Sequence, residues 1–314
     1  RHAGGGEDRR VPLRDIERIL WGDYQRMRYE APSSAKEAAK LLAGAKGKAV
    51  VLAGGTDLLV KMKSGVVEPD LIVDIKRIDA TQAIKKTGNG GFKVGAGVSG
   101  ARLGKSSALK KAWPGVVEAT NLIGSDQIQG RATMAGNLCN ASPAADSVPA
   151  MVAAGAKANV VGPSGRRTVA VEKIPTGPGK TSLKKGEIIE SISLPKKQPK
   201  SGDAYLRFIP RTEMDIAVVS AGVSLTIDGK GVVKKARVAL GAVAPTVLLV
   251  EDAAQAIIGT SLDDEALAAL ASACEAACKP IDDMRGTIEF RTEVAGVLGR
   301  RAALIAYERA GGKK

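Results

Sequence analysis

A short glycine-containing segment, Ala53 to Asp57, directly follows an apolar run. Glycine has no β-carbon, so Gly54 and Gly55 let the backbone approach a ligand closely. Thr56 adds a hydroxyl, and successive backbone N–H groups that enter a helix form a cradle for negative charge. The segment therefore predicts a pyrophosphate site, although a tight turn explains two glycines equally well.

A second segment of small and polar residues runs from Thr133 to Asn137 and continues through a polar stretch to Asp146. An apolar helical pattern follows directly. Hydroxyl, amide and carboxylate groups at this density favour ligand binding over a plain surface loop. Capping of the helix by Ser142 or Asp146 is an alternative that can coexist with binding. The two segments together predict one cofactor site.

Two further glycine motifs are weaker. Gly95 to Gly100 matches G-x-G-x-x-G, with Glu118 downstream as a ribose-binding acid, but its helix opens late. A nicotinamide-binding Rossmann site is therefore a minor alternative to a glycine-rich strand exit. Gly179 to Thr181 has the ending of a P-loop, yet Ile174 stands where the first glycine is required and Pro178 lies inside the loop, so this match fails.

Residue types that do chemistry by themselves are scarce. The single histidine, His2, leaves the body of the chain without histidine-assisted nucleophiles or histidine-rich metal sites. The three cysteines, Cys139, Cys274 and Cys278, are too few for a disulfide framework or a four-thiolate cluster, which favours a reducing cytoplasm. We predict no catalytic side chain and no metal ligand, so that a bound cofactor supplies the chemistry.

Charge and composition bear on two other classes of protein, those that bind nucleic acid and those that span a membrane. The 314 residues carry a net charge of +14, which suggests a nucleic-acid partner. With only 2 Trp, 4 Tyr and 3 Phe, however, an aromatic platform for single strands is poorly supplied, and nucleic-acid binding is disfavoured. No apolar run approaches the roughly 20 residues of a membrane span. The N-terminus has no apolar signal core, so the sequence predicts a cytoplasmic protein.

The elements that must position these motifs change in character along the chain. In the first part, predicted strands and helices alternate, at 33–44, 49–52, 57–63, 71–75, 92–96, 101–111, 116–123 and 145–156. A hairpin over 158–171 and a strand over 188–194 precede a linker over 196–202. In the second part, strands come first and helices follow, at 217–227, 236–243, 250–258, 264–279 and 290–310. This succession is typical of an α+β fold.

At these motifs the sequence closely resembles the medium, FAD-binding subunits of the molybdenum hydroxylase family, which includes carbon-monoxide and xanthine dehydrogenases. The resemblance is collinear from about Met27 to the C-terminus. Beyond the two segments, it includes the blocks Glu187-Ile188-Ile189, Arg211 to Ala217, Ala239 to Ala244, and Asp283-Met284-Arg285-Gly286.

The resemblance implies a two-lobed FAD-binding domain of the vanillyl-alcohol-oxidase (PCMH) type over 27–200. An N-terminal extension over 1–26 precedes it, and a smaller α+β domain over 203–314 follows it. FAD would lie between the lobes. The residues that the resemblance places around FAD are Val51, Leu52, Ala53, Gly54, Gly55, Thr56, Asp57, Leu58, Ile123, Thr133, Gly136, Asn137, Asp146, Ile189 and Arg207.

Within that set the resemblance also implies roles. The segment from Ala53 to Leu58 would wrap the pyrophosphate, and Thr133, Gly136 and Asn137 would form the opposite wall. Asp146 would hydrogen-bond the cofactor, Ile189 would lie against flavin or adenine, and Arg207 would stand near the flavin. The sequence departs from the family at Ala132 and Ala135, where glycine is common.

The function implied is electron transfer. A large subunit with a molybdenum cofactor would hydroxylate the substrate, and a small subunit with two [2Fe-2S] clusters would relay electrons to the FAD of this chain. NAD, a quinone or oxygen would accept them, in a complex built as a dimer of heterotrimers. The alternative is a basic binding or scaffolding protein without a working flavin site.

Overall fold

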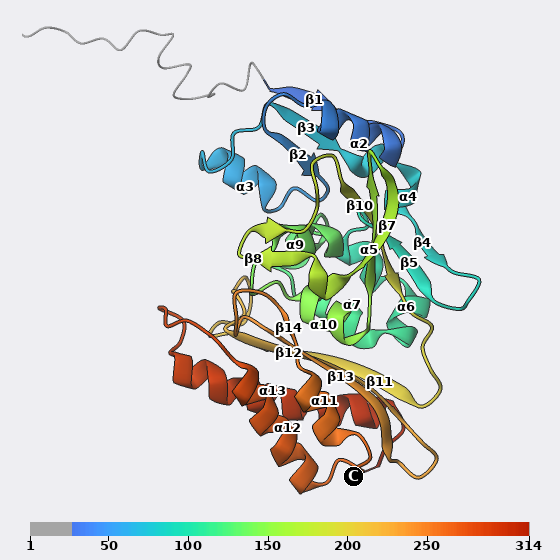
Figure 1. Ribbon diagram of the computed structural model, residues 1–314, viewed down its shortest axis with the longest axis vertical. Coiled ribbons are helices and arrows are strands. Elements are labelled where there is room, and N and C mark those ends of the chain that lie inside the picture. The colour runs from blue at the N-terminus through green and yellow to red at the C-terminus, as the bar shows by residue number, and fades with distance from the viewer. Residues whose placement is uncertain (1–26, 314) are drawn as a thin grey trace, which may run out of the picture.

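The first lobe is a small three-stranded sheet with two helices, drawn in blue at the top of Figure 1. Its elements are β1 (Arg28–Glu30), α2 (Ala35–Gly44), β2 (Ala49–Leu52), α3 (Leu58–Lys63) and β3 (Leu71–Asp74). The strands are parallel in the order β1-β3-β2, and the central strand β3 is fully buried. The computed structural model describes residues 27–313, so the extension predicted over 1–26 lies outside the described residues.

The helix predicted over 33–44 is confirmed as α2, and its first turn explains where it begins. Ser34 Oγ accepts a hydrogen bond from Glu37 N at 3.2 Å, and the Glu37 carboxylate accepts one from Ser33 N at 3.1 Å. This arrangement is close to a capping box, except that Glu37 binds the N–H of the residue before the N-cap Ser34. The buried face of α2, with Ala38 and Leu42, then packs into the first hydrophobic core.

The second lobe is a five-stranded antiparallel sheet with short helices around it. Its elements are η2 (Ile75–Arg77), α4 (Asp79–Gln82), β4 (Ile84–Lys86), β5 (Phe92–Gly95), α5 (Gly100–Gly104), α6 (Ser107–Ala112), α7 (Pro114–Thr120), α8 (Asp126–Gln129), α9 (Met134–Asn140), α10 (Ser147–Ala153), β6 (Lys157–Gly162), β7 (Gly165–Ala170), η3 (Val171–Lys173), β8 (Pro175–Gly177), β9 (Lys180–Thr181) and β10 (Ile188–Leu194). The sheet order is β4-β5-β10-β6-β7, and the predicted hairpin is confirmed as β6 and β7. The prediction of one helix over 101–111 is wrong in one respect, since α5 ends at Gly104 and Ser106 caps a separate helix, α6.

The Rossmann alternative at Gly95 to Gly100 is wrong. A Rossmann site needs a parallel strand, whereas β5 pairs antiparallel with both β4 and β10. The glycines serve close packing instead. A β-carbon on Gly95 would lie 2.2 Å from the Thr81 carbonyl oxygen, and one on Gly97 would lie 2.1 Å from Gln82 Nε2.

A four-stranded antiparallel sheet and three helices form the last part of the fold. Its elements are β11 (Ser201–Phe208), β12 (Val219–Ile227), β13 (Val233–Gly241), β14 (Leu248–Leu249), α11 (Glu251–Ile257), α12 (Asp264–Ala277) and α13 (Ile288–Arg309). The two predicted strands and three predicted helices are confirmed with shifted ends. The linker prediction over 196–202 is too long, because β11 begins at Ser201. Sequence reasoning missed this strand, because burial along it does not alternate: Gly202 to Tyr205 are all buried, and Leu206 to Phe208 are all partly exposed.

This last sheet is covered on both faces. Helix α13 packs along β11 and β12 from one side, while α7 and α10 of the second lobe pack from the other (Figure 1). Gly222 lets α10 come close, since a β-carbon there would lie 2.6 Å from the Pro149 carbonyl oxygen. A second hydrophobic core lies between the sheet and α11 to α13. Among the described residues, no helix has the length and apolar character to cross a membrane.

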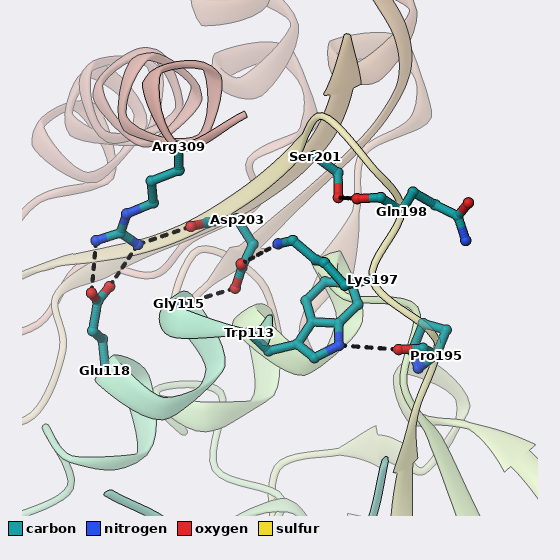
Figure 2. Close-up of polar contacts among 9 residues, drawn as sticks. All are labelled: Trp113, Gly115, Glu118, Pro195, Lys197, Gln198, Ser201, Asp203 and Arg309. Atoms are coloured by element: carbon teal, nitrogen blue, oxygen red, sulfur yellow. Dashed lines mark hydrogen bonds and ion pairs between the residues drawn. The ribbon is translucent and has the colours of Figure 1, made fainter. Parts of the chain in front are cut away.

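A polar network fastens β11 to the second lobe, as Figure 2 shows. One carboxylate oxygen of buried Asp203 accepts from Lys197 Nζ and the other from Gly115 N, both at 2.8 Å. The Lys197 ammonium also lies 4.5 Å from the centre of the Trp113 ring. At the end of α13, Arg309 binds the Glu118 carboxylate with both guanidinium nitrogens, at 2.7 and 3.0 Å.

Candidate functional site

A cavity of about 340 Å³ lies between the two lobes, within the size range of small-molecule sites. The first lobe contributes the end of β2, the glycine segment and α3. The second lobe contributes α9, the residue pair at the start of β10 and the loop after α7. The predicted site residues that line this cavity are Val51, Ala53, Gly54, Gly55, Thr56, Asp57, Leu58, Ile123, Thr133, Gly136, Asn137 and Ile189.

The glycine segment forms one wall by means of its backbone. Gly55 adopts φ +83°, a left-handed conformation that side-chain-bearing residues rarely adopt. Gly54 touches the other lobe, because a β-carbon there would lie 2.1 Å from the Arg131 carbonyl oxygen. In the described part of the chain, no group accepts a hydrogen bond from the amide N–H of Gly54, Gly55 or Thr56. Such donors at a cavity wall suit an anionic oxygen.

Side chains behind the glycine segment hold it in place. Lys76 Nζ donates to the Ala53 carbonyl at 3.3 Å and pairs with the Asp74 carboxylate at 2.8 Å. Tyr29 donates to the same carboxylate at 2.5 Å. Burial alone would raise the pKa of Asp74, but the hydrogen bonds from Lys76 and Tyr29 outweigh it and lower that pKa. The ionised Asp74 thus holds the Lys76 side chain directed at the loop.

The opposite wall is the first turn of α9. Thr133 Oγ1 accepts a hydrogen bond from Gly136 N at 2.9 Å, so this hydroxyl caps the helix. Asn137 Oδ1 accepts from Ser147 N at 3.1 Å and from Ser147 Oγ at 2.7 Å, which fixes the amide against the start of α10. Ala132 and Ala135 line the cavity with nearly buried methyl groups, where the resemblance leads one to expect glycine.

The remaining wall is mostly apolar. Ile123, Ile188 and Ile189 line it, and the register of β10 against β6 shifts just after Ile189. Glu187 reaches the same wall, where two nitrogens of Arg167 bind its carboxylate at 2.7 Å each. The hydrogen bonds from Arg167 outweigh burial and lower the pKa of Glu187. The wall therefore offers apolar surface, with one carboxylate at its edge whose charge is paired with that of Arg167.

Three predicted site residues lie outside the lining. Leu52 ends β2 and is not exposed to the cavity. Asp146 is buried at the start of α10, where Arg207 Nη1 and Tyr205 OH each donate to one of its oxygens at 2.8 Å. Burial outweighs the attraction of Arg207 and raises the pKa of Asp146. These contacts join β11 to the helix whose first residue binds Asn137.

Sequence reasoning missed several lining residues. They are Lys48, Val50, Lys61, Val67, Ile75, Ala96, Cys139, Asn140, Gly179, Leu183, Glu187 and Ile188. For Lys61 a signal existed, since it stands four residues after Asp57 on the same predicted helix. For Gly179 the sequence signal was misleading. Its segment does not match a P-loop, yet Gly179 lines the cavity. Among the described residues, no three His, Cys, Asp or Glu side chains gather as a metal site.

Comparison with known families defines the class. Residues 25–197 match the family described as the FAD binding domain in molybdopterin dehydrogenase. Residues 204–306 match the CO dehydrogenase flavoprotein C-terminal domain. The first match spans more than half of the chain, and the protein therefore belongs to this family of FAD-binding molybdopterin dehydrogenase chains.

Individual relatives agree along nearly the full length. The carbon monoxide dehydrogenase medium chain of Hydrogenophaga pseudoflava is 32% identical over 90% of this chain and 98% of its own. The xanthine dehydrogenase FAD-binding subunit of Escherichia coli O157:H7 is 29% identical over 91% and 97%. A solved structure of the Hydrogenophaga pseudoflava carbon monoxide dehydrogenase, at 33% identity, superimposes with a TM-score of 0.86 over 90% of this chain and 98% of its own.

These comparisons confirm the family resemblance, the two-lobed FAD-binding fold with its α+β C-terminal part, and FAD as the cofactor of an oxidoreductase. The cavity fits that cofactor on its own chemistry. Its unpaired amide donors and left-handed Gly55 suit phosphate oxygens, and its isoleucine wall suits flat rings. When bound, FAD supplies one- and two-electron chemistry that no side chain here provides.

Proposed function

We propose that this chain is the electron-transferring flavoprotein subunit of a heteromeric molybdenum hydroxylase. The single observation that carries the proposal is the cavity between the lobes, which brings together the two segments at Ala53 to Asp57 and Thr133 to Asn137. In the proposed complex, electrons pass from iron–sulfur clusters of a small subunit to the FAD site, and then to NAD, a quinone or oxygen. A large subunit with a molybdenum cofactor hydroxylates the substrate.

Ten of the fifteen predicted residues then have a proposed task. Gly54, Gly55 and Thr56 donate amide hydrogen bonds to the pyrophosphate, and the Thr133 hydroxyl shapes the facing helix turn. Asn137 borders the cofactor, and Ile123 and Ile189 cover its rings. We propose that Leu52, Asp146 and Arg207 act from outside the lining: Leu52 supports the glycine segment, and the Asp146–Arg207 ion pair positions α10 behind Asn137.

The same proposal divides the chain into an FAD-binding domain over 27–200 and a C-terminal domain over 203–314. Two separate hydrophobic cores support this division. It also includes a cytoplasmic location and a dimer of heterotrimers. Size-exclusion chromatography of a native complex, followed by subunit stoichiometry, tests the assembly; a chain that stays monomeric in its native host would contradict it.

Exposed apolar side chains on the C-terminal part support a partner subunit. They lie on two adjoining segments that Arg291, near the start of α13, holds together: its Nη1 donates to the Val218 carbonyl at 2.7 Å and its Nη2 to Asp283 Oδ1 at 2.6 Å. Met284 is 94% exposed and Ile281 68%. Met214, Ile216 and Ile288 are also exposed. Exposed apolar side chains that gather in this way are typical of surfaces covered by another protein.

Flavin binding by the purified full chain tests the cofactor assignment. We expect flavin absorbance bands in the protein as isolated or after reconstitution with FAD. Replacement of Thr133 by Val should lower FAD affinity while the fold, followed by circular dichroism, is retained. A protein that cannot be reconstituted with FAD, or whose FAD affinity is unchanged by both Thr133→Val and Gly55→Val, would contradict the proposed site.

A further inference from the structure

Lys61 places a positive charge in the wall of the cavity. It stands in the last turn of α3, and its side chain lines the cavity beside the glycine segment. Its Nζ donates a hydrogen bond to Asn140 Oδ1 at 2.5 Å, across the gap between the lobes. Asn140 Nδ2 in turn donates to Asp57 Oδ1 at 3.1 Å. The three side chains therefore tie α3 and the glycine segment to the end of α9.

The charge of Lys61 is not neutralised by this contact. Its bonded partner is a neutral amide, and within the described residues Lys61 forms no ion pair with a carboxylate. Of the two acids that line the same cavity, Asp57 accepts a hydrogen bond from Asn140, and Glu187 is bound by Arg167. A partly buried ammonium that forms no direct ion pair among the described residues favours an anionic ligand, because a charge-assisted hydrogen bond is roughly twice as strong as a neutral one.

We propose that Lys61, held in position by Asn140, binds the phosphate groups of the cofactor and makes the site select phosphate-bearing flavins over riboflavin. This rests on the proposed function, in which the glycine segment surrounds the pyrophosphate. The segment supplies amide donors without net charge, whereas Lys61 supplies the charge. Asn140 acts as a positioning residue, since its amide oxygen orients the ammonium and its amide nitrogen is anchored on Asp57.

Lys63 provides a matched control on the same helix. It lies two residues further on, carries the same charge and is exposed, but it does not line the cavity. The variants Lys61→Met and Lys63→Met therefore remove the same charge and keep a similar aliphatic stem. A third variant, Lys61→Arg, keeps the charge at the cavity.

The test measures dissociation constants of the full chain, freed of flavin, for FAD and riboflavin by fluorescence titration. We expect Lys61→Met to weaken FAD binding roughly ten- to a hundredfold, the range of one charge-assisted hydrogen bond. Riboflavin binding should change by less than about twofold, since it has no phosphate to lose. Lys63→Met should leave both constants near wild type, and Lys61→Arg should restore most of the FAD affinity.

Salt dependence gives a second measurement that does not need a riboflavin constant. The FAD affinity of the wild type should fall as sodium chloride rises, and the slope should be smaller in Lys61→Met than in Lys63→Met. Equal losses for FAD and riboflavin, or equal salt slopes in the two variants, would overturn the role of Lys61. A wild-type chain that binds no FAD at all would instead overturn the proposed function.

Discussion

Two buried carboxylates in different regions of the molecule have nearly the same exposure but opposite electrostatics. Glu190, in β10 beside the cavity, has a side chain that is 5% exposed, and Asp203, between the second lobe and the last sheet, one that is 4% exposed. Hydrogen bonds from Arg166 outweigh burial and lower the pKa of Glu190. Burial outweighs the attraction of Lys197 and raises the pKa of Asp203.

The partners explain the difference. Arg166 binds both oxygens of Glu190, at 2.7 and 2.9 Å, and its own side chain is 63% exposed, so water solvates the cation. Lys197 is 20% exposed and reaches only one oxygen of Asp203. A buried ion pair gains less than its desolvation costs unless its geometry satisfies both charges. A solvated arginine that binds both oxygens thus lowers the pKa of buried Glu190, whereas a mostly buried lysine on one oxygen does not offset the burial of Asp203.

Removal of Asp203, at the interface between the second lobe and the last sheet, should give the largest effect on stability. Asp203→Ala should lower the free energy of unfolding by about 3 kcal/mol, because Lys197 is left without its partner and Gly115 N–H without its acceptor. Asp203→Asn should lose less, since its amide oxygen can still accept one of these bonds. Urea unfolding measures both. Equal stabilities of Asp203→Ala and the wild type would show that the network contributes nothing.

Addition of a β-carbon at the cavity wall should give the second-largest effect. Gly54→Ala should lower stability by about 2 kcal/mol and weaken FAD binding, since its methyl group would clash with the Arg131 carbonyl. Gly44→Ala is the matched control, because a β-carbon there meets nothing within 4 Å. Urea unfolding and FAD titration check the pair. If both variants behaved alike, the close approach of the lobes at Gly54 would not matter.

The two acids should also respond to pH with opposite signs. The lowered pKa of Glu190 means that its contribution is present above its ordinary value of 4.5 and is lost as pH falls through the folded pKa. The stability difference between wild type and Glu190→Gln should therefore grow as pH rises from the acid side.

For Asp203 the raised pKa means that its contribution is present below its ordinary value of 3.8 and is lost as pH rises through the folded pKa. The difference between wild type and Asp203→Asn should therefore shrink as pH rises. Unfolding free energies measured from pH 3 to pH 7, a range of about four units around these values, test both signs. If the two stability differences changed with pH in the same direction, the opposite pKa shifts of Glu190 and Asp203 would be contradicted.

The surface pair at the end of α13 should give the smallest effect. Glu118→Gln should cost about 0.5 kcal/mol, because both side chains are partly exposed and Arg309 keeps its hydrogen bond to the Asp203 carbonyl at 2.9 Å. Differential scanning calorimetry at low and high salt checks this. A loss as large as that of Asp203→Ala would place Glu118 among the essential interface contacts.

The sequence by itself determined the family and the cofactor, and it predicted the two segments that face each other across the cavity. Glycine positions, hydroxyls and apolar periodicity are local signals, so the segments at Ala53 to Asp57 and Thr133 to Asn137 could be read directly, as could α2 and the β6–β7 hairpin. The strand β11 escaped, because it begins inside a run of lysine, proline and glycine that is typical of a linker.

Only the tertiary structure decided which side chains meet. The contact of Lys61 with Asn140 joins residues far apart in the chain, and the ion pair of Asp146 with Arg207 turns two predicted cofactor ligands toward each other. The G-x-G-x-x-G motif that begins at Gly95 likewise follows a strand of an antiparallel sheet. There Gly95 packs against Thr81 and does not form a dinucleotide site. Such outcomes depend on strand direction and on long-range packing, which local residue patterns do not encode.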